Sequence, residues 1–153
     1  EMSYYIVEDL VRQANDQQPA PYPFNVGRPQ DINIFDDTAE GPLLWLIPGQ
    51  VTATPTGYGN RLLLEYEVEL FVFEQGDMHD TNEQAYIRIK LEEAIAQQLL
   101  KTILTNADSE GYTASGIKLS PVYLYATPQG GNGPFTGISL TFTLRIYDDY
   151  SIC

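Results

Sequence analysis

The chain of 153 residues has few of the residues on which disulfides, metal centres and nucleic-acid binding depend. Its single cysteine, Cys153, excludes an internal disulfide and a cysteine metal cluster, and suggests folding in a reducing compartment. Eight basic residues stand against 21 acidic ones, so the net charge is −13 and the average field repels phosphate. Specific binding to nucleic acid is therefore not expected. The charge suits a wall that DNA passes without adhering, although solubility is the simpler interpretation.

Several motifs are also missing. No run of about 18 apolar residues could span a membrane, and no signal-peptide core is present, so we expect no membrane partner. His79 is the only histidine, and no Gly-x-Ser-x-Gly turn accompanies it, which argues against a nucleophilic triad. Neither a Walker loop nor a Gly-x-Gly-x-x-Gly motif occurs. Glu1 precedes Met2, and we take Met2 as the natural start and Glu1 as an added residue.

Residues 62–74 contain the clearest strand pattern in the first half of the chain. Apolar side chains alternate with charged ones, which is typical of a strand that buries one face. The apolar face comprises Leu64, Tyr66, Val68, Leu70 and Val72. The opposite face carries Glu65, Glu67 and Glu69 and continues into Phe71 and Phe73. With hydrophobic residues at 43% and charged ones at 19%, residues 1–153 suit a single globular domain around this strand.

The elements before this strand are short. Residues 3–16 predict an amphipathic helix that Ser3 can cap, and the proline-rich residues 19–24 should end it and run extended. Short strands are expected at 31–35, 43–47 and 51–54, the last two forming one bent strand or two separate ones around Pro48. The turn-forming residues 55–60 then predict an antiparallel hairpin with the central strand.

A long helix should follow, from Asp80 or Thr81 to about Asn106. We expect its buried stripe to consist of Ile87, Leu91, Ala94, Ile95, Leu99, Leu100, Ile103 and Leu104. Residues 117–126 predict a strand interrupted by Pro121, residues 127–136 a flexible loop, and residues 138–147 a final alternating strand. The predicted fold class is α+β, with a mostly antiparallel sheet covered on one face by the long helix and the short N-terminal helix.

Candidate chemical groups are few. Asp77, His79 and Asp80 could together hold a metal, but they share one short loop, where a helix-capping turn is the simpler interpretation. Glu65, Glu67 and Glu69 could supply an acid/base pair, but without burial or a shaped pocket a solvated face is the simplest interpretation. We therefore predict no catalytic residue, no metal and no cofactor, and expect a protein that is not an enzyme.

Assembly is the remaining interpretation. A sheet face that is polar without being fully charged suits contact with copies of the same chain. We expect this intersubunit face to include Phe71, Phe73, Thr141, Thr143 and Tyr147. The edges beside Pro48 and Pro121 should be available for the same purpose.

The order of these elements over residues 3–150 resembles the tail terminator, or tail-completion, proteins of long-tailed bacteriophages. The resemblance implies a virion structural protein, made in the host bacterial cytoplasm, that forms a ring, commonly a hexamer. Such a ring caps the tail tube and meets the head connector. It also implies that Glu65, Glu67 and Glu69 face the lumen, through which DNA passes, and that a glycine-rich assembly loop reaches a neighbour. That loop comprises Gly130, Gly131, Asn132, Gly133 and Pro134.

Two alternatives of other classes stay open. One is a small acidic hydrolase that uses Asp77, His79 or the glutamate row, and the other is a monomeric module that binds a peptide or glycan. Other connector and tail-tube proteins also share this size and acidity.

Overall fold

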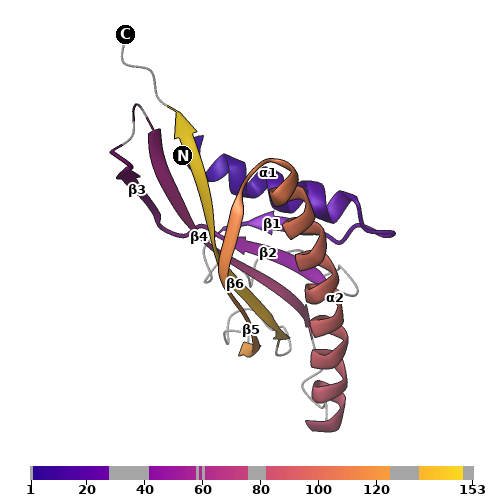
Figure 1. Ribbon diagram of the computed structural model, residues 1–153. Helices are drawn as coiled ribbons and strands as arrows, with labels where there is room; N and C mark the ends of the chain where they lie inside the picture. Colours follow the sequence, from indigo (N-terminus) through magenta and orange to yellow (C-terminus); the bar gives the residue numbers. More distant parts are fainter. Residues whose placement is uncertain are drawn as a thin grey trace.

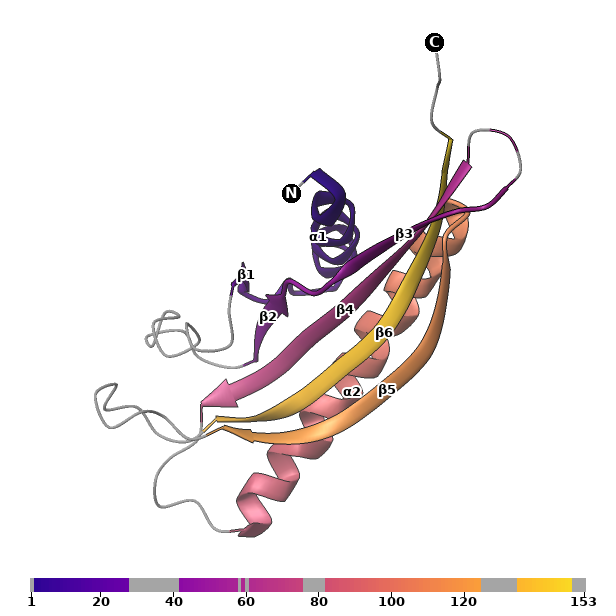
Figure 2. The same ribbon diagram turned by 90° about the vertical axis from the view of Figure 1, so that its left-hand side faces the viewer.

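The computed structural model shows an α+β fold, as the sequence predicts. It describes residues 2–27, 42–57, 59, 61–75, 82–124 and 135–149. Within this part of the chain two helices lie on one face of a six-stranded, mostly antiparallel sheet (Figures 1 and 2). The strand order is β1-β2-β4-β6-β5, and β3 pairs with β4. The opposite face of the sheet, which we call the helix-free face, has no described helix over it.

Helix α1, Met2–Asp16, forms where its apolar spacing predicts, and it buries Val7, Leu10, Val11 and Ala14 against the sheet and α2. The turn that follows is held by Asn15, whose amide donates to the carbonyl of Tyr22 at 2.8 Å. The same side chain accepts the backbone N–H of Tyr22 at 3.0 Å. These two bonds satisfy the buried amide and fix where the chain leaves the helix.

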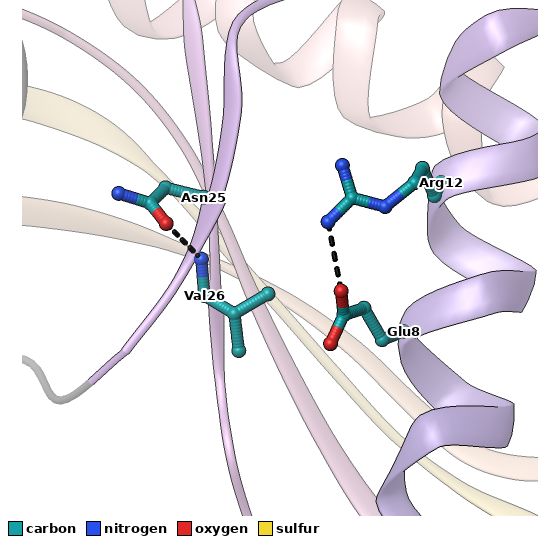
Figure 3. A network of polar contacts seen from close by, with 4 residues as sticks. All are labelled: Glu8, Arg12, Asn25 and Val26. Carbon is teal, nitrogen blue, oxygen red and sulfur yellow. Dashed lines mark hydrogen bonds and ion pairs between the residues drawn. The ribbon is translucent and has the colours of Figure 1, made fainter.

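Strand β1, Phe24–Val26, is one element that the sequence did not predict. It pairs in parallel with β2, Leu43–Ile47. The guanidinium of Arg12 on α1 lies 4.7 Å from the centre of the Phe24 ring. Arg12 also pairs with Glu8 at 2.8 Å (Figure 3). With only three residues beside a proline-rich segment, β1 has no alternation to detect. The strand expected at residues 31–35 lies outside the described residues.

Strands β2 and β3, Val51–Pro55, both pair antiparallel with the same edge of β4, Arg61–Gln75. They are the two short strands that the sequence allowed, and β3 and β4 form the predicted hairpin. Gly49 lies in the bend between the two strands. Only glycine fits there, because a Cβ would collide with the carbonyl oxygen of Glu67. The backbone N–H of Glu67 donates to Gln50 at 2.9 Å, so hydrogen bonding to β4 continues through the bend.

Strands β4 and β6, Phe135–Asp149, form the longest pairing in the sheet, with a register from Arg61 opposite Asp149 to Gln75 opposite Phe135. The outer neighbour of β6 is β5, Thr113–Leu124. The sequence predicted a start at residue 117, but the strand begins earlier. A bulge at Gly116, whose φ is 65°, interrupts the alternation on which the prediction depended. Of the predicted loop 127–136, the last two residues belong to β6 and the rest lies outside the described residues.

Helix α2, Asn82–Ser109, crosses the covered face of the sheet (Figure 1). The predicted buried stripe is confirmed at Leu99 and Ile103 but is wrong at Ile87, Leu91 and Ala94, which are exposed. The observed stripe is Ile89, Glu92, Ala96, Leu99, Ile103 and Ala107. Ile87 and Leu91 are exposed because they lie on the side of α2 that faces away from the sheet, whereas Ile89 and Glu92 on the same turns face the sheet and are buried.

Candidate functional site

The glutamate row of β4 lies on the helix-free face, as its alternation predicts. Arg145 Nε donates to Glu65 Oε2 at 2.9 Å, and the hydroxyl of Ser139 donates to Glu69 Oε2 at 3.2 Å. Glu67, opposite Thr143 on β6, is exposed. The row is thus partly compensated by its neighbours, and an orientation toward a lumen stays a prediction.

A shallow hollow of about 320 Å³ lies beside the row, and its lining includes Gly49 and Gly116, which have no side chains to fill it. Charged and hydroxyl groups share its lining: Glu67, Glu69, Lys118, Thr141 and Thr143. Carboxylate, ammonium and hydroxyl groups of this kind can make polar and charged contacts with another surface.

Phe71 and Phe73 correct the prediction for the intersubunit face. They do point to the helix-free face, but their exposed fractions are only 8% and 1%. They form a second apolar cluster with Leu43, Trp45 and Ile47, against which Val122 packs. The indole N–H of Trp45 donates to the carbonyl of Gly27 at 3.0 Å and helps to hold this cluster in place. Neither phenylalanine therefore offers surface to a neighbour, because side chains of β2 and of Val122 pack against them within the same chain.

Tyr147 lies at the other end of the same face and is 56% exposed. The guanidinium of Arg61 is 5.1 Å from the centre of its ring. The two residues border a hollow of about 470 Å³ whose lining also includes Thr54, Pro55, Thr56 and Leu63. Contact of Thr141, Thr143 and Tyr147 with another subunit stays a prediction.

Other sequence candidates fall outside the described residues: Asp77, His79 and Asp80, and the loop residues Gly130 to Pro134. Within the described ranges, no three histidine, cysteine or acidic side chains come together in a way that could hold a metal ion. The two described helices include no stretch that is both long and apolar enough to span a membrane.

The N-terminal half of α2 exposes a group of large side chains, although the sequence pattern predicts that two of them, Ile87 and Leu91, are buried. Tyr86, Ile87 and Leu91 are 60%, 51% and 56% exposed. Lys90 completes the group, with its ammonium 5.3 Å from the centre of the Tyr86 ring. At 3.6 residues per turn, Lys90 points about 160° away from Glu92, which faces the sheet. We call these four residues the knob.

The burial of Glu92 is the second feature of α2 that the sequence did not predict. Its side chain is fully buried, and neither carboxyl oxygen has a hydrogen bond of good geometry within the described residues. Burial, followed by repulsion from Glu74 of β4, raises its pKa to about 9. Arg88, the backbone of Glu74 and the hydroxyl of Thr136 oppose that rise more weakly. The carboxyl is therefore protonated at neutral pH.

Glu74 of β4, which is partly buried, lies close enough to Glu92 to affect its charge. Desolvation raises the pKa of its carboxyl, and the nearby charge of Arg88 limits the rise. The signal for Glu92 was present in the sequence, because the spacing Ile89, Glu92, Ala96, Leu99 follows a helical stripe. The predicted stripe through Ile87 and Leu91 contains no charged residue, and an uncharged stripe is the more usual buried face of a helix.

No protein-family model matches the chain, and no curated protein is significantly similar to it.

Proposed function

We propose that this chain is a structural subunit of a long-tailed phage virion, a tail terminator that forms a ring with its own copies. The ring, a hexamer by the family resemblance, caps the tail tube and joins it to the head connector. The protein is made in the host cytoplasm and acts in the assembled particle.

The observation that carries this proposal is the knob on α2. Three large apolar side chains, each more than half exposed, lie together on the side of the helix that faces away from the sheet. Scattered single hydrophobic residues need no explanation, but a group rimmed by polar residues marks a contact surface. Such a group is expected on a subunit whose contact surface becomes buried only when it assembles.

The helix-free face supports the same proposal. It is built mainly on two strands of 15 residues each, and it carries the glutamate row at its centre. In a ring with this face inward, like charge keeps DNA from adhering as it passes. The pairing of Glu65 with Arg145 leaves the exposed Glu67 as the strongest contributor to that field.

The experiment has two parts. Light scattering after size exclusion measures the mass of the purified chain, alone and with tail tubes of the same phage. We expect a closed ring, alone or on the tube end, and negative-stain images should show one ring per tube. A chain that stays monomeric in both conditions, and that antibodies do not detect on purified virions, would contradict the proposal.

A specific observation also favours a second candidate, a peptide- or glycan-binding module. The hollow beside Tyr147 combines an exposed aromatic ring with Arg61 and two threonines. Aromatic faces with neighbouring polar groups suit sugars and peptides. Binding on a glycan or peptide array, lost in the Tyr147→Ala variant, would support this candidate.

A further inference from the structure

A groove lies at the end of the helical layer opposite the knob. It forms where α1 passes the residues that follow α2, and its volume is about 200 Å³. Ile6, Leu10 and Tyr112 supply apolar surface, and Asp9 and Glu110 supply carboxylates. Gln13 completes the lining. The groove thus suits a ligand that is apolar with a positive charge at its rim.

The knob and the groove are far apart on one molecule. Lys90 and Glu110 are separated by 20 residues, which corresponds to roughly 30 Å along a helix. The knob lies near the start of α2, Asn82–Ser109, whereas the groove is lined by Glu110 and Tyr112, which follow the end of this helix. The two surfaces cannot meet within one chain, so they can meet only between chains.

Charge gives a reason for the pairing. A chain with a net charge of −13 repels its own copies on average, so a contact between copies needs local complementarity. Lys90 is one of only eight basic residues and stands exposed beside three apolar side chains. The groove has the matching character, since the carboxylates of Asp9 and Glu110 flank its apolar lining.

We propose that the knob of one copy docks into the groove of the next copy, a head-to-tail contact that deepens and rests on the ring function proposed above. Ile87 and Leu91 pack on Ile6 and Tyr112, which are partly exposed in the groove, and Lys90 lies between the two carboxylates. Because the two surfaces differ, the contact is heterologous and closes into a ring when the rotation between copies permits.

The strand edges favour a contact through helices. The outer edge of the sheet is β5, which is interrupted by the bulge at Gly116 and by Pro121, and which carries the exposed Lys118. Bulges, proline and lysine are the features that prevent one strand edge from pairing with another. Extension of the sheet from copy to copy through β5 is therefore disfavoured.

Two variants test the proposal by complementation. The knob variant carries Lys90→Glu and Leu91→Asp, and the groove variant carries Asp9→Lys and Glu110→Lys. All four positions lie at least partly on the surface. Each variant alone should be monomeric, with the concentration for half-assembly raised more than about tenfold. An equimolar mixture of the two should associate, because the unchanged knob of the groove variant meets the unchanged groove of the knob variant.

The matched control is Lys101→Glu, the same substitution as at Lys90, on the exposed side of the same helix but outside the knob. It should assemble as the unchanged chain does. Circular dichroism of every variant separates a lost contact from a lost fold. As a second measurement, the Lys90→Glu, Glu110→Lys double variant should regain assembly, because the charges of the pair are exchanged and not removed.

The outcomes separate this contact from the proposed function. If the unchanged chain forms rings and both variants do so equally well, the knob-to-groove contact is overturned while the ring function stands. If the mixture stays monomeric although the unchanged chain forms rings, the contact is not heterologous and the proposal fails. If the unchanged chain is monomeric alone and on tail tubes, both proposals fall together.

Discussion

The two halves of α2 distribute polar and apolar residues in opposite ways. In the C-terminal half, Leu99 and Ile103 face the sheet while Lys101 and Thr105 face outward, as in an ordinary surface helix. In the N-terminal half, the sheet-facing stripe contains the carboxyl of Glu92, and three large apolar residues face outward. The same helix thus follows the amphipathic rule along one half and departs from it at Glu92 and at the exposed apolar residues of the other.

The difference shows where stability and where contact are located. Burial of a carboxyl without good hydrogen bonds is unfavourable, and so is exposure of large apolar side chains. Natural chains keep such arrangements where another requirement outweighs stability, and contact with a partner is the common one. We therefore expect the C-terminal half to stabilise the fold and the N-terminal half to make the contact.

The largest expected effect separates the two halves by leucine truncation. Leu99→Ala should lower the free energy of unfolding by about 2–5 kcal/mol, because the side chain is fully buried. Leu91→Ala, the same substitution two turns earlier, should change it by less than about 0.5 kcal/mol. Urea unfolding followed by circular dichroism measures both. Equal losses at the two sites would contradict the distinction between the halves.

The next effect depends on pH. The pKa of Glu92 is about 9 in the folded chain against an ordinary value of 4.5, so the folded state binds more protons between these values. The free energy of unfolding should therefore fall as pH rises from about 4.5 to about 9, and the raised pKa of Glu74 acts in the same direction. Glu92→Gln should remove most of this loss.

We expect the Glu92→Gln variant to match the unchanged chain near pH 4 and to exceed its stability at pH 8 by on the order of 2 kcal/mol. The matched control is Glu93→Gln, since Glu93 is the exposed neighbour on the same turn. Thermal unfolding at several pH values measures both variants. A gain that is independent of pH would show that packing, and not ionisation, distinguishes Glu92.

The smallest effect concerns how the C-terminal half holds α1. The buried amide of Gln18 donates to the carbonyl of Ala14 at 3.0 Å and to the hydroxyl of Thr102 at 3.2 Å. Gln18→Ala should lower the free energy of unfolding by about 1 kcal/mol. Hydrogen exchange should increase at the end of α1 and not at the knob. Gln98→Ala, at an exposed position of α2, is the control and should have no measurable effect.

The sequence predicted β4 and β6 well because alternation over many residues leaves one register that buries a whole apolar face. Leu70 and Leu140 are opposite each other and fully buried, in agreement with the two patterns. The short β1 was missed since three residues carry no periodic signal. The row Glu65, Glu67, Glu69 was placed on the correct face, but its pairing with Arg145 and Ser139 required the register of β6.

Two errors have a common physical cause. Phe71 and Phe73 continue the face of the glutamates, so the alternation predicted exposure, yet side chains of the neighbouring strand β2 pack against them and bury them. Along α2 the apolar pattern allowed two stripes, and the side of the helix that packs on the sheet decided between them. Periodicity identifies which side chains share a face, but it does not reveal which face or which part of it other segments bury.

The amino-acid order alone determined the two long strands, the long helix, the hairpin and the acidic row, because each depends on contacts near in sequence or on a sustained period. Only the tertiary structure decided which side of α2 is buried, that Glu92 is held neutral, and that the knob and groove lie at opposite ends. These properties depend on how α2 is oriented and placed against the sheet and α1, an arrangement that arises only when distant segments pack together.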